Sequence, residues 1–202
     1  STAASLPATP AASHAAPAPT TETIILVRHG EKPEGGLGQL SCRGLNRSLK
    51  LPAVIARDFG KPDAIFAPDP AKEKMDGGAS YAYNRPLATV EPTAIRFQMP
   101  VDTRFGYNEI DKLQAALQQP QYSNATILVG WEHKQLYKLA RNLLKDNGGD
   151  KAAVPAGDAT YVPMKPTAGI GQPVEGGWNF QEQESPIGKR AYWFNHYMLL
   201  TV

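Results

Sequence analysis

The stretch TIILVRHGEKP, residues 23–33, decides which fold this chain can adopt. Its first five residues are all aliphatic or β-branched, which is typical of a strand buried on both faces of a parallel sheet. The run leads directly into Arg28, His29 and Gly30, and then into a charged, glycine-containing loop. The sequence therefore predicts a central strand that presents an arginine and a histidine at its carboxyl end.

The composition is that of an ordinary globular protein. The 202 residues are enough for one domain with a sizeable core, with 42% hydrophobic and 20% charged residues. The formal net charge of +2 gives no reason to expect nucleic acid or an acidic membrane as a partner. No segment approaches the roughly 20 apolar residues that cross a bilayer.

The N-terminal segment has a different composition from the rest. Residues 1–22 consist mainly of Ala, Pro, Thr and Ser, which bury too little apolar surface to offset their ordering entropy. We expect a disordered tether over 1–22 and a single domain over 23–202. The chain starts at Ser1, which fits an exported protein, periplasmic or secreted, after signal removal. A shortened chain fits equally, and a cytoplasmic location stays open.

Apolar runs alternate with helical patterns along the domain, which favours an α/β fold. Helices are expected at 44–60, 85–97, 107–119 and 133–149. The first is expected to be kinked or restarted at Pro52, and the second to be capped by Asn84 and broken or bent at Pro92. The expected strands are 23–27, 63–67, 125–130, 159–164 and 191–200. The helix at 44–60 has Leu45, Leu49, Ile55 and Phe59 at near-helical spacing, and residues 67–84 are expected to form a loop-like insertion.

A second pair of polar residues follows the strand at 125–130. Glu132 and His133 come directly after it, as Arg28 and His29 follow the first strand. The carboxyl ends of parallel strands meet at one edge of a sheet, where ligand sites form. A helix beginning near His133 would also point its amide groups into that space, which favours an anion. The pattern predicts a site for a phosphoryl group.

Four motifs in order resemble the histidine phosphatase superfamily. They are LVRHGEKP, LSCRG, RPLATVEPTA and ILVGWEHKQL, and together they span about Thr23 to Leu144. The resemblance implies a phosphoglycerate-mutase-like fold, a three-layer α/β/α sandwich around a mostly parallel central sheet. It also implies a metal-independent phosphatase without a cofactor, which acts on a small phosphorylated substrate.

The same resemblance implies a role for each matching residue. His29 would be the nucleophile that forms a phosphohistidine. Arg28 and Arg85 would clamp the phosphoryl oxygens, and His133 would hydrogen-bond them from the other side. A side chain at Gly30 would crowd the approaching phosphate.

Three glutamates compete for the role of proton donor to the leaving group. Glu109 lies in RFGYNEID, which resembles a family turn that carries this acid, although Ile110 replaces its glycine. Glu132 is the rival because it adjoins His133, and Glu31 is a weaker candidate.

The substrate and two other functions stay open. Glu31, Lys32 and Pro33 stand where mutases of the family carry a Ser and an Asn, which favours a phosphatase over a mutase. The alternatives are a catalytically silent module that binds a phosphorylated ligand and a metal-dependent hydrolase. Whether the 67–84 insertion forms a partial lid, and the oligomeric state, stay open.

Other polar residues near these motifs are expected to be solvated. Arg43 and Arg47 are predicted to lie on an exposed helix face. A mobile, solvated insertion is favoured over contact with substrate for Lys72, Lys74, Tyr81 and Tyr83.

Overall fold

A computed structural model describes residues 18, 20–149, 180–184, 190–194 and 197–201. The helices are α1 (Cys42–Asp58), α2 (Arg85–Phe97), α3 (Ile110–Leu117), the 3₁₀ helix η1 (Pro120–Tyr122) and α4 (His133–Asp146). The strands are β1 (Thr23–Arg28), β2 (Ala64–Phe66), β3 (Lys74–Asp76), β4 (Ala79–Tyr81), β5 (Thr126–Trp131), β6 (Phe180–Glu184), β7 (Arg190–Phe194) and β8 (Tyr197–Thr201). Most of the predicted tether and the strand predicted at 159–164 lie outside the described residues.

The central sheet has the strand order β2-β5-β1-β8-β7-β6. The pairs β2–β5 and β5–β1 are parallel, whereas β1–β8, β8–β7 and β7–β6 are antiparallel. Four of the six strands therefore run in the direction of β1, and the predicted α/β class is confirmed. The single strand predicted over 191–200 is instead the antiparallel pair β7 and β8.

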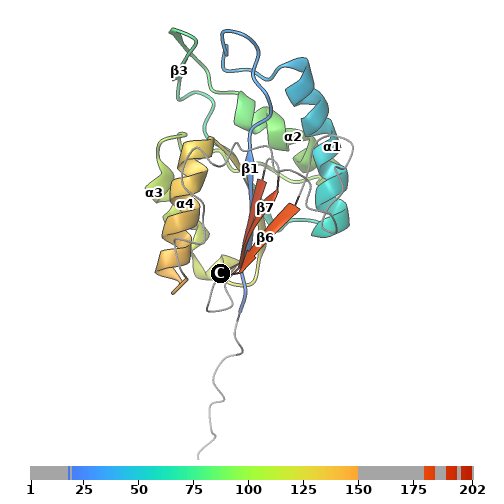
Figure 1. Cartoon of the computed structure of the whole chain (residues 1–202), viewed down its shortest axis with the longest axis vertical. Helices are drawn as coiled ribbons and strands as arrows, with labels where there is room; N and C mark the ends of the chain where they lie inside the picture. Colours follow the sequence, from blue (N-terminus) through green and yellow to red (C-terminus); the bar gives the residue numbers. More distant parts are fainter. Residues whose placement is uncertain (1–17, 19, 150–179, 185–189, 195–196, 202) are drawn as a thin grey trace, which may run out of the picture.

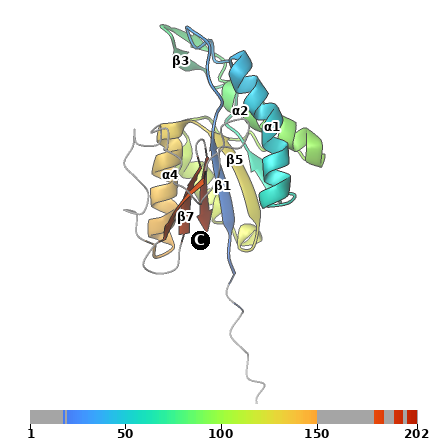
Figure 2. The same cartoon turned by 45° about the vertical axis from the view of Figure 1, so that its right-hand side comes forward.

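Helices cover both faces of the sheet, as the three-layer prediction requires (Figures 1 and 2). Alternate residues of β1 enter two different cores because successive side chains of a strand point to opposite faces. Ile24 and Leu26 pack with residues of α3 and α4, and Ile25 and Val27 pack with residues of α1 and α2. β1 is thus buried on both faces, and its polar ending is confined to the sheet edge.

The helix predictions hold for α4 and partly fail for α1 and α2. The apolar stripe of α4 is buried as predicted, and it comprises Leu136, Leu139, Ala140, Leu143 and Leu144. Both α1 and α2 continue through their internal prolines, so the helix is not restarted at Pro52 and not broken at Pro92. Asn84 precedes α2 as predicted but makes no side-chain capping bond.

The buried face of α1 differs from the predicted one. Ile55 is buried as predicted, but Leu45 and Leu49 are 48% and 58% exposed, and Leu51 and Val54 are buried in their place. The helix begins at Cys42, with Ser41 as the N-cap whose hydroxyl accepts a hydrogen bond from the Gly44 amide at 3.1 Å. The second half of the helix, rather than a stripe along its whole length, supplies its apolar contact with the sheet.

The insertion at 67–84 contains an ordered hairpin instead of a plain loop. Strands β3 and β4 pair antiparallel, and Gly77 and Gly78 form the two-residue connection. Both glycines have positive φ, 63° and 94°, which hairpin turns of this length require. The DGG sequence carries this signal. The hairpin lies beside the loop that follows β1, at the end of the molecule where β1 terminates (Figure 1).

No helix in the described part of the chain combines the length and the apolar character that crossing a membrane demands.

Candidate active site

The register of the parallel strands brings the two predicted polar pairs together. Arg28 is the register partner of Trp131, and the His29 amide donates to the Trp131 carbonyl at 3.2 Å. The residue after each strand therefore lies at the same level of the sheet edge. His29 follows β1 there, and Glu132 and His133 follow β5.

These residues line a pocket of about 280 Å³. Four of its lining residues come from the sheet edge and form what we call the sheet wall: Arg28, His29, Glu132 and His133. Three come from the loop after β1 and from the hairpin and form the hairpin wall: Lys32, Lys74 and Asp76. The remaining lining residues are Gly30, Glu31, Arg47 and Arg85. The structure thus brings together five predicted site residues: Arg28, His29, Gly30, Arg85 and His133.

His29 is held in one orientation by a hydrogen bond to its own neighbour. The ring is 8% exposed, and Nδ1 lies 2.8 Å from the Gly30 carbonyl oxygen. A carbonyl only accepts, so Nδ1 carries the proton and Nε2 keeps its lone pair. Burial lowers the pKa of His29 to about 3; the Gly30 bond opposes this, and the charges of Arg85 and Arg28 reinforce it. The ring is therefore neutral at physiological pH, with Nε2 as a nucleophilic or accepting atom.

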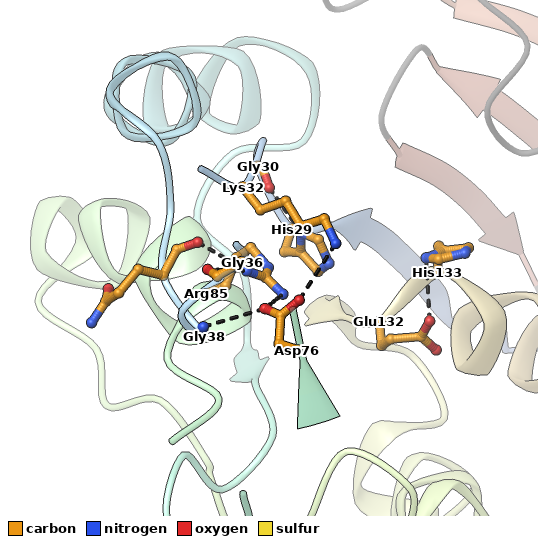
Figure 3. Close-up of polar contacts among 10 residues, drawn as sticks. His29, Gly30, Lys32, Gly36, Gly38, Asp76, Arg85, Glu132 and His133 are labelled. Atoms are coloured by element: carbon orange, nitrogen blue, oxygen red, sulfur yellow. Dashed lines mark hydrogen bonds and ion pairs between the residues drawn. The ribbon is translucent and has the colours of Figure 1, made fainter. Parts of the chain in front are cut away.

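Glu132 and His133 share the start of α4. Glu132 is the N-cap, and its Oε2 accepts a hydrogen bond from the Gln135 amide at 2.9 Å. Its Oε1 lies 3.2 Å from Nδ1 of His133 (Figure 3). Burial lowers the pKa of His133, the Glu132 carboxylate opposes the shift, and Arg28 adds to it.

Arg85 reaches the pocket from the first residue of α2 and is 3% exposed. Its Nη2 donates to Oδ2 of Asp76 at 2.8 Å, and its Nη1 donates to the carbonyls of Gly36 and Gln39 at 3.1 and 3.0 Å. Asp76 also accepts from the Gly38 amide at 3.2 Å and lies 3.4 Å from Lys32 Nζ (Figure 3). Burial acts to raise the pKa of Asp76, but Arg85 and these other donors outweigh it and hold the pKa below its ordinary value. The guanidinium is thus fixed by a buried ion pair.

The hairpin and the loop after β1 meet too closely for side chains at two glycines. A Cβ on Gly36 would collide with the Asp76 carboxylate, and one on Gly77 would collide with the Gly35 carbonyl. Both glycines also have positive φ, 75° and 63°, so a side chain would be strained as well as crowded. The hairpin wall therefore depends on these close backbone contacts.

Gly30 has a steric role that the structure makes specific. A Cβ there would lie 2.9 Å from Gly44 Cα and 3.1 Å from Leu40 Cδ2. Its amide donates to Thr89 Oγ1 at 3.0 Å. The atoms that a side chain would meet first belong to α1 and the preceding loop, and glycine here lets the start of α1 pack against the end of β1.

Glu109 does not line this pocket, in contrast to the other predicted site residues. Its Oε2 accepts from the Gly106 amide at 2.7 Å, and its Oε1 lies 2.5 Å from Lys112 Nζ. The hydrogen bonds from Lys112 and then Gly106 lower the pKa of Glu109. Of the two rivals, Glu31 and Glu132 both line the pocket, and Glu31 is paired with Arg47 and Arg43.

Three expectations of solvated residues are wrong, and one of them concerns Lys74, which lines the pocket from an ordered strand. Arg47 is 6% exposed and lines the pocket, and Tyr83 is fully buried, with its ring edge-on to His29 at 6.1 Å between centroids. Arg43 is exposed as predicted. The sequence reasoning also missed Asp76 as a site residue. The DGG turn was the available signal, because it places the preceding aspartate at the end of a hairpin strand.

Within the residues that the structure describes, no group of three or more His, Cys, Asp or Glu side chains is arranged to hold a metal ion.

No protein-family model and no curated protein match this chain. Solved structures that are similar to it include a mycobacterial glucosyl-3-phosphoglycerate phosphatase with inorganic phosphate, at 16% identity and a TM-score of 0.43 over 61% of this chain and 79% of that one. A phosphohistidine phosphatase SixA structure from Nakamurella multipartitia has 15% identity and a TM-score of 0.45 over 65% and 73%. A structure named mycobacterial hydrolase 1 has 16% identity and a TM-score of 0.44 over 62% and 82%.

Proposed function

We propose that this protein is a phosphatase that hydrolyses a phosphomonoester through a phosphohistidine on His29. The observation that carries the proposal is the hydrogen bond from Nδ1 of His29 to the Gly30 carbonyl. It leaves Nε2 unprotonated in a pocket that also contains Arg28, Arg85 and His133. A neutral imidazole with a fixed tautomer, surrounded by cations, is suited to attack an anionic phosphorus centre.

In this mechanism Nε2 of His29 forms a bond to phosphorus while the ester oxygen leaves. Arg28 and His133 stabilise the equatorial oxygens. Arg85 acts as a fixed positive charge rather than as a bidentate clamp, because both of its terminal nitrogens already donate to protein oxygens. Water then attacks the phosphohistidine and gives a proton to the carboxylate that had protonated the leaving group. The P–N bond breaks, phosphate is released and the free imidazole is regenerated. The two arginines supply the positive charge and His133 a hydrogen bond, so the proposed reaction needs no metal.

We assign the proton donor to Glu132. A leaving alkoxide needs an acid within reach, and Glu132 lines the pocket whereas Glu109 does not. Of the other pocket carboxylates, Asp76 is paired with Arg85 and Glu31 with Arg47, so each already contacts a guanidinium. Glu132 has no Lys or Arg partner among the ion pairs of the described residues. As an N-cap it is also fixed in position.

The test is to trap the intermediate. The protein is mixed with a ³²P-labelled aryl phosphate and quenched in alkali, and the label is located by peptide mapping. We expect an adduct on His29 that is stable in base and labile in acid, and that is absent from His29→Ala. A protein that turns over the ester without this adduct would contradict the proposal. Full turnover in the presence of a chelator is expected, and its loss would favour the metal-dependent hydrolase.

The same aryl phosphate distinguishes the proposed phosphatase from the alternative, a catalytically silent module that binds a phosphorylated ligand. An aryl phosphate has a good leaving group that hardly needs an acid, so a protein with a working nucleophile turns it over. A protein that binds vanadate at His29 but neither hydrolyses the ester nor accumulates the adduct would be a binding module.

A further inference from the structure

The strand β3 turns two charged side chains toward the pocket. Lys74 and Asp76 both line it, whereas Met75 between them is 67% exposed. This alternation is the two-residue period of a strand with one face on the site. The hairpin wall is therefore part of the binding surface.

The two charges on this strand have different partners. Asp76 is committed to Arg85, Lys32 and the Gly38 amide. Lys74 has no carboxylate within ion-pair distance among the described residues. Its Nζ lies 5.3 Å from the ring centroids of both Tyr83 and Tyr107, which are edge-on to one another at 5.4 Å. Two aromatic rings can hold an ammonium group without neutralising its charge.

The anchor of this arrangement is rigid. Tyr83 is fully buried, and it packs edge-on against His29 on one side and Tyr107 on the other. The Lys74 ammonium therefore lies over a buried ring that itself contacts the nucleophile His29. The Lys74 charge also acts on His133 across the pocket. Burial is the largest cause of the lowered pKa of His133 and Glu132 opposes it, while Arg28, Lys134 and then Lys74 lower it further.

We propose that Lys74, held over Tyr83 and Tyr107, forms a second anion subsite, and that the substrate is a small phosphomonoester with a further anionic group, a carboxylate or a second phosphate. This inference rests on the proposed function for the phosphoryl site itself. Arg28, Arg85 and His133 already serve the transferred phosphoryl group, so the Lys74 charge is left for another part of the molecule. The pocket volume of about 280 Å³ is near the lower end, roughly 300 Å³, of small-molecule sites, which suits a compact dianionic or trianionic substrate.

Binding of two phosphonates tests the subsite without relying on turnover. Phenylphosphonate and 3-carboxyphenylphosphonate differ only by a carboxylate, and neither can be hydrolysed. We expect the wild-type protein to bind the carboxylated compound about tenfold more tightly by calorimetry, the effect of one charge-assisted hydrogen bond. In Lys74→Met this preference is lost, and in Lys74→Arg most of it is kept.

Lys72→Met is the matched control. Lys72 belongs to the same insertion, is exposed and does not line the pocket. This variant should keep the wild-type preference, because it removes an equal charge from nearby without touching the subsite.

Three results would overturn the inference. They are equal affinity of the wild-type protein for the two phosphonates, an equal loss of affinity for both in Lys74→Met, and an equal loss of preference in Lys72→Met. The wild-type comparison decides the case if Lys74→Met does not fold. The failure of the proposed function looks different: the phosphonates bind with the expected preference, but phenyl phosphate is neither turned over nor forms an adduct on His29.

Discussion

The sheet wall and the hairpin wall of the pocket differ in what holds their side chains in place. In the sheet wall, strand register fixes the positions, because Arg28 is aligned with Trp131 and the reactive residues follow directly. In the hairpin wall, the side chains are held in place by close contacts at glycines and by the buried ion pair Asp76–Arg85. A wall built on register can be predicted from hydrophobic runs, whereas a wall built on contacts distant in sequence cannot.

The largest expected effect is on the sheet wall. His29→Ala should lower turnover of an aryl phosphate by about 10⁴-fold or more, as loss of a nucleophile does in other covalent mechanisms. His133→Gln is the comparison within the same wall. It should be slow but still form the His29 adduct. Steady-state rates and adduct yield measure both, and a His29→Ala protein that keeps substantial activity would remove the sheet wall from the chemistry.

The second largest expected effect distinguishes Glu132 from Glu109 as the proton donor to the leaving group. Glu132→Gln should lower kcat for an alkyl phosphate by about 10²-fold or more, and for an aryl phosphate much less, because only the alkoxide needs a proton. Glutamine can still accept the Gln135 hydrogen bond, so the start of α4 is preserved. Glu109→Gln should leave the ratio of alkyl to aryl rates unchanged. The reverse pattern would return the acid role to Glu109.

The hairpin wall is tested through its ion pair. Asp76→Asn should lower the free energy of unfolding by about 3 kcal/mol, because it leaves the buried guanidinium of Arg85 without its counter-charge. Glu73→Gln, an exposed position in the same insertion, should change it by less than about 0.5 kcal/mol. Urea titrations measure both. Equal stability of the two variants would mean that close contacts alone hold this wall.

The smallest expected effect concerns pH. The His29 pKa of about 3 in the folded protein lies below the ordinary value of 6.5, so between these values the unfolded chain binds a proton that the folded one does not. Stability is therefore present in full above pH 6.5 and falls as the pH decreases. From pH 7 to pH 5 the loss due to this ring is about 2 kcal/mol. In His29→Gln this part of the decline should be absent, as measured by urea titrations at pH 7 and pH 5. An equal loss of unfolding free energy between these pH values in the wild-type protein and in the variant would contradict the prediction.

The same contrast explains which parts of the structure the sequence could predict. The strands 23–27 and 125–130 and the stripe of α4 follow from periodicity, and with them the meeting of His29 and His133. Asp76 was missed because its partners are Gly38 and Arg85, and nothing in the local pattern around residue 76 names them. Leu45 and Leu49 were misassigned since helical spacing does not say which end of α1 packs on the sheet. The outward position of Glu109 depends on the local bond to Gly106.

The collision that a side chain at Gly36 or Gly77 would cause has a consequence for engineering. The segment after β1 and the hairpin contact one another so closely that each requires glycines in the other or at its own contact point. Replacing only one of them with the corresponding segment of a distant homologue should therefore cause a steric clash. A chimera that receives both segments together should retain the hairpin wall, and a chimera that receives only one of them should lose it. Libraries aimed at new specificities would therefore do best to vary Lys74 and its aromatic neighbours on an unchanged frame.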